Sequence, residues 1–217
     1  MTLTRFLVGL TVAMAGISAV AAPSAHADNC GQAKPPLDAA SKQVGRGSML
    51  WISRNGTVGI TTPGGTGAVQ VSNAGGPPLQ AFLIDAQQDG NQQLIISNTE
   101  VAHLYTVSGC EITAVTDAQG APFMFDLQEA RSGPASGGTG VDCLDLGEGR
   151  HLVGLLAQPT DNGVAVRRTQ INLTGAVAAP GKSDTAFGQS QHDPVVASAS
   201  TISCGDLTLN KDGVRQP

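Results

Sequence analysis

The chain has 217 residues, of which 41% are hydrophobic, 13% are charged and only 3% are aromatic, and its formal net charge is −5. Ordinary globular domains are roughly 25% charged, and the excess of acids over bases here leaves no basic patch for binding nucleic acid. Beyond Ala22 no apolar run approaches the roughly 18 residues of a membrane span, which excludes a transmembrane segment in the rest of the chain.

Residues 1–27 have the pattern of a secretory signal peptide. An apolar run from Phe6 to Ala22 is followed by Ala25-His26-Ala27, a small-x-small cleavage site, and then by Asp28. We therefore expect a single exported domain, residues 28–217, that is extracellular or lies in the cell envelope. The Ala- and Gly-rich composition with few lysines suggests a bacterial source.

The exported part has the pattern of an all-β protein. Short β-rich runs alternate with Gly, Pro, Asn or Asp, and helical periodicity is absent nearly everywhere. This spacing predicts antiparallel sheets, arranged as propeller-like repeats or alternatively as a β-sandwich. The predicted strands are Met49–Ser53, Val58–Thr62, Ala68–Val71, Ala81–Ile84, Gln92–Ser97, Ala102–Val107, Glu111–Thr116, Pro122–Phe125, Val141–Leu144, His151–Ala157, Val164–Leu173, Val195–Ala199 and Ile202–Leu209.

Four cysteines, Cys30, Cys110, Cys143 and Cys204, lie in the exported part and allow three pairings. The absence of a CxxC motif argues against zinc and against thioredoxin-like chemistry, and an oxidising compartment favours two structural disulfides. Cys30 and Cys204 lie close to the two ends of the exported chain. Among the three pairings we favour Cys30–Cys204, which would join the termini, together with Cys110–Cys143, which would join neighbouring repeats.

Comparison of the chain with itself indicates three related units, near residues 46–84, 83–127 and 142–188. Leu50–Ser53 matches Leu94–Ser97, and several other pairs share nearly the same spacing. Each unit contains a turn with Asp and Gly, an apolar strand and further strands separated by Gly-marked turns. The alternative is a chance alignment between Val- and Gly-rich strands.

The turn Ile84-Asp85-Ala86-Gln87-Gln88-Asp89-Gly90, followed by Leu94-Ile95-Ile96, resembles the Asp-rich turn and strand of FG-GAP or VCBS-type repeats. The segment Asp145–Val153 resembles the same element with one residue fewer. The resemblance covers residues 46–190 and implies an integrin-like β-propeller of the kind that many secreted bacterial proteins contain. Closed propellers usually have about four to eight blades, so three visible units leave an open assembly or a sandwich as alternatives.

In that family the turn often binds Ca²⁺ through oxygens at alternate positions, which here would be Asp85, Gln87 and Asp89, and Gly90 would permit the sharp bend. Calcium prefers about six to eight hard oxygen ligands. Because Gln87 replaces an acid and no Glu follows in the strand, we expect an Asx-capped turn without an ion. No cofactor is therefore predicted, and Ca²⁺ binding is the alternative.

Motifs for phosphate binding and for serine protease chemistry match only in part. Gly175–Ser183 is close to a phosphate-binding loop, but its glycines are one residue too far apart. Gly133–Gly138 follows His103 and Asp117 or Asp126 in the order of a protease triad. The spacing is too short for the two barrels of such proteases, and a Ser/Gly loop explains the same residues.

Single histidines and acids give no coherent catalytic set either. The three histidines of the exported part are not at metal-ligand spacing, and we expect them to be surface or edge residues. Three acids near the third unit could form a carboxylate pair for glycoside hydrolysis, but they lie in a turn and few aromatic rings accompany them. These residues are His103, His151 and His192, and Asp142, Asp145 and Glu148.

Together these patterns favour a secreted, non-enzymatic all-β protein that binds a protein or a cell-envelope component. A secreted hydrolase that acts on envelope glycan or peptide is the alternative. Convergence of His, Asp and Ser in one deep pocket would favour the hydrolase, whereas an exposed face without such a set would favour the binding protein.

Overall fold

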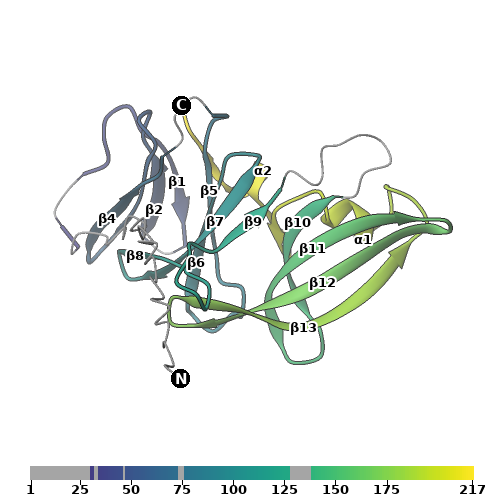
Figure 1. Ribbon diagram of the computed structural model, residues 1–217. Helices are drawn as coiled ribbons and strands as arrows, with labels where there is room; N and C mark the ends of the chain where they lie inside the picture. Colours follow the sequence, from purple (N-terminus) through teal and green to yellow (C-terminus); the bar gives the residue numbers. More distant parts are fainter. Residues whose placement is uncertain (1–29, 32–33, 46, 73–75, 128–137) are drawn as a thin grey trace, which may run out of the picture.

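The computed structural model describes residues 30–31, 34–45, 47–72, 76–127 and 138–217. These residues form antiparallel β-sheets with two short helices and two disulfides, so the predicted all-β class is confirmed. The predicted signal peptide, residues 1–27, and the cleavage position at Asp28 lie outside the described residues. Three layers of sheet follow one another along the chain (Figure 1).

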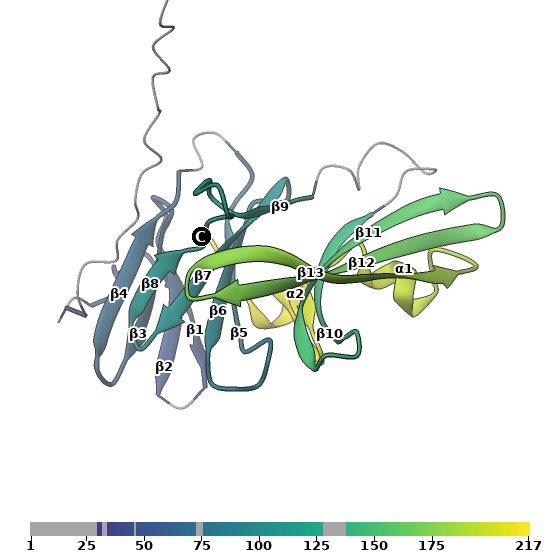
Figure 2. The same ribbon diagram turned by 60° about the horizontal axis from the view of Figure 1, so that its bottom comes forward.

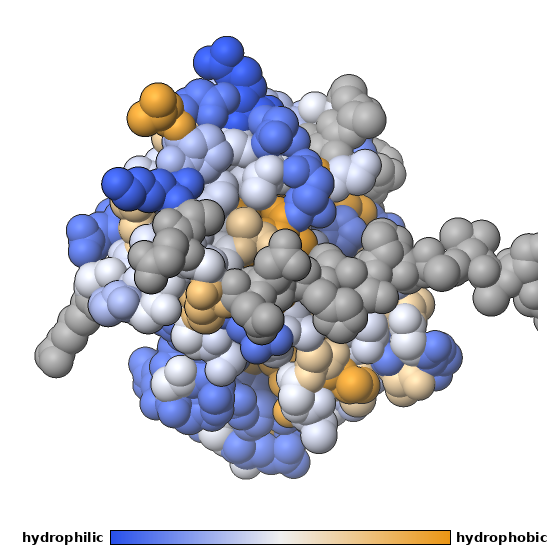
Figure 3. All heavy atoms as spheres, turned by 90° about the vertical axis from the view of Figure 1, so that its left-hand side faces the viewer, coloured by the Kyte–Doolittle hydropathy of each residue, from blue (hydrophilic) through white to orange (hydrophobic). Residues whose placement is uncertain are grey.

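The first layer, here called the N-terminal sheet, is a meander of four strands that pair in sequence order. Its second strand carries Leu50 and Ile52 into the core, whereas Trp51 lies on the opposite face above Gly59, whose missing side chain makes room for the indole. Figure 3 shows that this side of the molecule is mostly hydrophilic. The strands are β1 (Ala40–Val44), β2 (Ser48–Ile52), β3 (Thr57–Thr62) and β4 (Gly65–Gln70).

The second layer, the central sheet, has the order β16-β5-β6-β7-β8, and β9 also pairs with β7. Adjacent side chains of a strand point to opposite faces, and here both faces are covered. Leu83 packs in one core cluster with Leu50, while its neighbour Phe82 packs in another with Val141. The strands are β5 (Gln80–Ile84), β6 (Gln92–Ser97), β7 (Val101–Ser108), β8 (Glu111–Ala114), β9 (Met124–Asp126) and β16 (Val214–Arg215).

The third layer, the C-terminal sheet, has the longest strands and extends beyond the central sheet (Figures 1 and 2). One part of the C-terminal sheet packs on the central sheet. Strand β13 also contacts the segment after β8, where the Ala178 N–H donates a hydrogen bond to the Thr116 carbonyl at 2.7 Å. Its strands are β10 (Thr139–Asp145), β11 (Arg150–Thr160), β12 (Gly163–Thr174) and β13 (Val177–Gly188).

The C-terminal segment closes the fold by returning to the central sheet. It contains helix α1 (Pro194–Ser198), a hairpin of β14 (Ser203–Cys204) and β15 (Leu207–Thr208), and helix α2 (Leu209–Asp212). Strand β16 then pairs with β5, so the last residues become an edge of the middle layer.

The predicted strand Val195–Ala199 is wrong, because these residues belong to helix α1 and its C-cap. Two β-branched valines favour a strand locally. Pro194 at the start of the segment instead fits the first turn of a helix, where its fixed φ and missing N–H cost nothing. Val196 and Ala199 then pack on the outer part of the C-terminal sheet, and this burial decides the conformation.

The three layers are each built on a four-strand meander, and the sheets pack face to face as in the sandwich alternative. Of the matched segments, Leu94–Ser97 lies on β6, and Leu50–Ser53 lies on β2 except for Ser53, which directly follows it. Each is the second strand of its meander. The unit boundaries 46–84, 83–127 and 142–188, and the FG-GAP-type resemblance, stay predictions.

All four cysteines form disulfides, but the predicted pairing is wrong. The bonds are Cys30–Cys110 and Cys143–Cys204, with Cα–Cα distances of 5.7 and 4.6 Å. The expectation that the termini are joined fails because β14 carries Cys204 to β10, while the described chain begins at Cys30 beside β4 and the β7–β8 turn. The first disulfide therefore links the start of the described chain to the β7–β8 turn, and the second links β10 to β14. Neither disulfide joins Cys30 to Cys204.

Candidate functional site

The predicted calcium turn connects β5 to β6 and is capped by its own first acid. Asp85 Oδ1 accepts a hydrogen bond from the Asp89 N–H at 3.2 Å, and Asp85 Oδ2 accepts one from the Gly90 N–H at 2.9 Å. Gly90 has φ +90°, which glycine adopts without strain. The Asx-capped turn is therefore confirmed. Gln87 is exposed, and it lines a shallow hollow beside Asn91.

The turn between β10 and β11 is capped in the same way. Asp145 Oδ1 accepts hydrogen bonds from the N–H groups of Gly147, Glu148 and Gly149 at 2.6, 3.1 and 3.0 Å. The Gly147 N–H is the main reason that the pKa of Asp145 lies below its ordinary value. Asp142 Oδ1 accepts from the Cys143 N–H at 2.8 Å. The oxygens of Asp142 and Asp145 thus serve the local backbone.

Among the candidate protease residues, His103 and Asp126 lie on the paired strands β7 and β9, where Asp126 is opposite Val101, and Asp117 lies in a turn. Asp117 caps its own turn, because Oδ1 accepts from the N–H groups of Gln119 and Ala121, both at 2.9 Å. His103 lies half-buried on β7, where burial lowers its pKa. Ser136 lies outside the described residues, and Asp126 lies on β9.

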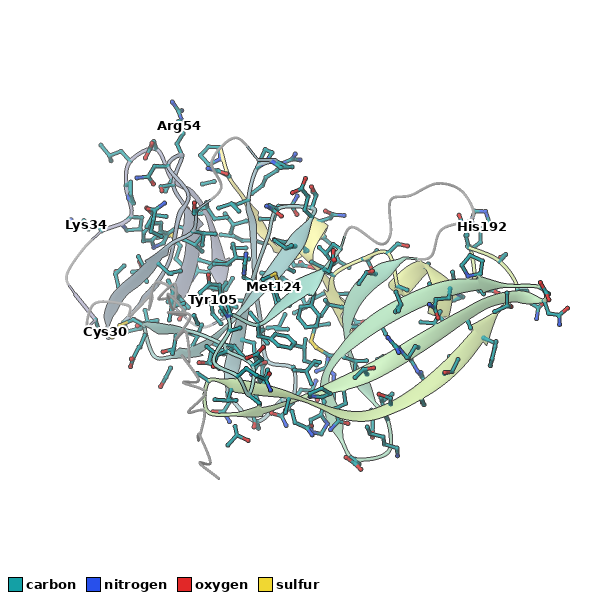
Figure 4. The ribbon with its side chains drawn as sticks, viewed as in Figure 1. Cys30, Lys34, Arg54, Tyr105, Met124 and His192 are labelled. Carbon is teal, nitrogen blue, oxygen red and sulfur yellow. A yellow bond between two sulfur atoms is a disulfide. The ribbon has the colours of Figure 1, made fainter. Side chains whose placement is uncertain are left out.

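The other two histidines lie at separate places. His151 Nδ1 is 2.9 Å from the Gly149 carbonyl oxygen, within the β10–β11 turn region. His192 lies before α1, at the end of the molecule opposite Cys30 (Figure 4). Within the described ranges, no group of three or more His, Cys, Asp and Glu side chains is arranged to hold a metal ion.

The phosphate-loop-like segment forms a β-hairpin. Gly175 occupies the β12–β13 turn with φ +60°, and Gly181, Lys182 and Ser183 lie within β13. Strand β13 continues beyond them to Gly188, so their N–H groups do not form a phosphate cradle at a helix start.

A cleft that no sequence motif indicates lies where the central sheet, the C-terminal sheet and the C-terminal segment meet. We call it the junction cleft; its volume is about 310 Å³, at the lower end of ligand pockets. It is lined by Gln80, Ser97, Thr99, Leu127, Thr139, Ser200, Thr201, Ile202, Thr208, Leu209 and Asn210.

The side chains of the junction cleft are neutral, and several of its polar groups have no partner. Thr139 Oγ1 is buried and makes no hydrogen bond, although buried hydroxyls are normally paired. Within the described part of the chain, three of the lining side chains make no hydrogen bond: Gln80, Ser200 and Asn210. The lining side chains thus offer hydroxyl and amide groups, and none can act as a general acid or base.

Thr99 lines the same cleft with an unusual backbone. Its φ of +74° places a β-branched residue in the left-handed region, which costs about 1–3 kcal/mol. The turn around it is held by Asn98 Oδ1, which accepts from the N–H groups of Glu100 and Val101 at 3.1 and 3.0 Å. Such strain gathers at binding and active sites, so it marks the junction cleft independently of the unpaired Thr139 hydroxyl.

Sequence reasoning missed this site because its residues are common and scattered. Gln80, Thr139 and Asn210 come from three parts of the chain, and none belongs to a chemical motif. Asn98 before Thr99 indicates a turn, but it does not show that the turn borders a cleft.

No protein-family model matches the sequence, and neither a curated protein nor a solved structure matches it. Neither of the two helices in the described residues has the length and apolar character needed to cross a membrane. The geometry of the junction cleft therefore carries the functional argument.

Proposed function

We propose that the exported chain, residues 28–217, is a non-enzymatic binding protein that holds a protein or a cell-envelope component at the junction cleft. The observation that carries this proposal is the junction cleft itself, with a volume of about 310 Å³, a lining of neutral polar and aliphatic side chains, and the strained backbone of Thr99 at its border.

The cleft chemistry supports binding over catalysis. Hydrolysis needs a nucleophile, a base or an acid within reach of the substrate, and the lining side chains are hydroxyls, amides and aliphatic groups. The hydroxyls of Ser97 and Thr139 have no histidine among their neighbours in the lining to activate them.

Export is supported by two independent features. Residues 1–27 have the order of a signal peptide. The disulfides Cys30–Cys110 and Cys143–Cys204 suit an oxidising compartment.

A capture experiment with matched variants tests the proposal. The exported chain is immobilised and incubated with culture filtrate and envelope extract of the producing organism, beside a Gln80→Ala/Asn210→Ala variant of the cleft. The control is Phe187→Ala, which removes a side chain that is 70% exposed on β13. We expect a component that the wild type and the control retain and that the cleft variant loses.

The same extracts distinguish the hydrolase alternative. Release of new reducing ends or new amino groups from envelope glycan or peptide, at a rate proportional to the concentration of the purified protein, would contradict the non-enzymatic proposal. Equal capture by the cleft variant would contradict the placement of the site.

A further inference from the structure

We infer that Asn162 is a site of spontaneous deamidation, where the exported protein gains an isoaspartate and a negative charge as it ages. Asn is followed by Gly at two positions of the chain, Asn55-Gly56 and Asn162-Gly163. The structure treats these two sites differently in exposure, in hydrogen bonding and in backbone constraint. Asn162 does not line the junction cleft, so the modification is independent of binding there.

The reaction uses only groups of the chain and water. The backbone nitrogen of the residue after an asparagine, once it has lost its proton to the solvent, attacks the side-chain amide carbon. The C–N bond of the amide breaks, ammonia leaves and a cyclic succinimide remains. Water then opens the ring at either carbonyl and gives aspartate or isoaspartate, with no change of oxidation state. A following Gly favours the attack because it has no side chain to obstruct it.

Asn162 lies in the tight turn between β11 and β12, at an end of the C-terminal sheet that projects beyond the central sheet (Figures 1 and 2). Both loop residues, Asp161 and Asn162, are exposed. The side-chain hydrogen bond of this turn joins the Thr160 hydroxyl to the Gly163 carbonyl at 3.1 Å. Among the described residues, the Asn162 side chain has no hydrogen-bond partner. Its amide is therefore free to rotate toward the Gly163 nitrogen.

The backbone at this turn can open at little cost. Thr160 and Gly163 form the last pair of the β11–β12 ladder, and the frayed end of a ladder opens with a small free energy. The nearest buried residues of the two strands are Ala157 and Val166. The Gly163 nitrogen can therefore become available for attack without disturbance of the core.

Asn55 lies in the turn between β2 and β3 and is held from several sides. Its Oδ1 accepts hydrogen bonds from the Thr57 N–H at 3.2 Å, from the Thr57 hydroxyl at 2.8 Å and from the Ser53 hydroxyl. The Gly56 N–H, whose nitrogen would attack, donates to the Ser53 carbonyl at 3.1 Å, and Gly56 is buried. Succinimide formation at Asn55 therefore requires these hydrogen bonds to break first.

Deamidation at Asn162 changes the charge and the backbone of the turn. A carboxylate replaces the neutral amide beside Asp161, so adjacent negative charges face the solvent. An isoaspartate also adds a carbon atom to the main chain of a two-residue loop, which alters the pairing of Thr160 with Gly163. Because the loop is exposed, the modified protein should stay folded and keep its melting temperature.

Peptide mapping by mass spectrometry of the disulfide-bonded exported chain, aged at neutral and at mildly alkaline pH, tests the inference. Deamidation is scored by the mass gain of each Asn–Gly peptide, and isoaspartate is scored by methylation with an isoaspartyl methyltransferase. We expect Asn162 to react at least about tenfold faster than Asn55, because more than one hydrogen bond must break before Asn55 reacts. Both rates should rise with pH, since the attacking nitrogen must lose its proton.

Matched variants separate the effect of the fold from that of the neighbouring residues. Thr57→Val removes one donor to Asn55 Oδ1 and should speed deamidation at Asn55 while the rate at Asn162 stays the same. Asn162→Gln should abolish the acidic form that ion-exchange chromatography separates from the aged wild type. In the reduced chain unfolded in urea, the two sites should react at similar rates, because both are followed by Gly.

Equal rates at the two sites of the folded protein, or a faster reaction at Asn55, would overturn the inference. A rate ratio in urea as large as that in the folded protein would also overturn it, since the contrast would then come from neighbouring residues instead of the fold. Persistence of the acidic form in Asn162→Gln would place the modification at another residue.

Discussion

At the scale of single residues, two aspartates determine how neighbouring strands are connected. Asp85 accepts two backbone N–H bonds after β5, and Asp145 accepts three after β10. Each turn also uses a glycine with positive φ, such as Gly90 and Gly149. The carboxylates therefore cap the turns, since their oxygens accept hydrogen bonds from backbone donors.

Gly90→Ala should lower the free energy of unfolding by about 1–2 kcal/mol, because a β-carbon opposes φ +90° although no neighbour lies within 4 Å. Gln87→Ala should change stability by less than about 0.5 kcal/mol, since Gln87 is exposed. Urea unfolding of both variants measures the difference. An equal loss for the two variants would contradict the backbone explanation.

Asp145→Asn should weaken the dependence of stability on acid pH. Because the Gly147 N–H lowers the folded-state pKa below that of the unfolded chain, the ionised Asp145 contributes stability above its unfolded pKa. That contribution is lost as the pH falls through the lowered folded-state pKa, below about pH 4. Urea unfolding across this range should show a shallower acid decline for Asp145→Asn than for the wild type, and an equal decline would contradict this account of Asp145.

At the scale of elements, close contacts between layers depend on small residues at particular positions. Strand β4 crosses the β7–β8 turn at Gly67, where an added β-carbon would lie 1.8 Å from the Cys110 carbonyl oxygen. The neighbouring disulfide Cys30–Cys110 joins the same turn to the start of the described chain. The contact between the N-terminal and central sheets therefore requires glycine at this position.

Gly67→Ala should destabilise the protein by about 1–3 kcal/mol or more, because backbone must move to admit the methyl group. Gly64→Ala is the matched control, since its added β-carbon would meet only Thr62 Oγ1 at an ordinary 3.7 Å. Thermal unfolding of the two variants checks the claim, and a melting temperature for Gly67→Ala at or above that of Gly64→Ala would refute it.

At the scale of the whole molecule, the disulfides connect segments that are distant in sequence. Cys143 and Cys204 are separated by 61 residues and bring the C-terminal hairpin to β10, beside the junction cleft. The lining residues Thr139 and Thr208 lie on the two segments that this bond joins. The bond therefore supports the cleft as well as the fold.

Cys143→Ser/Cys204→Ser should lower stability by about 2–5 kcal/mol, as the loss of a native disulfide does in small exported domains. The double variant should also capture less ligand through the junction cleft than the wild type. This loss should persist below the melting temperature of the variant, where unfolding does not explain it. Non-reduced peptide mapping of the wild type should recover Cys30 with Cys110 and Cys143 with Cys204. Recovery of a Cys30–Cys204 peptide would contradict the observed pairing.

Local chemistry was enough to predict the all-β class, most strands, the capped turn at Asp85 and the participation of four cysteines in disulfides. These features depend on alternation, turn residues and nearest-neighbour hydrogen bonds, which the order of residues contains. The strand predicted at Val195–Ala199 failed because burial against the C-terminal sheet outweighed local β-propensity.

The disulfide partners, the face-to-face layers and the junction cleft depend on contacts between residues far apart in the chain. Phe82 and Leu83 belong to one apolar run in the sequence. Only the packing of the three layers shows that their side chains lie in different cores. Thr139 is an ordinary threonine in the sequence, and only the fold places it in the lining of the junction cleft. Long-range burial of this kind has no local pattern from which it could be predicted.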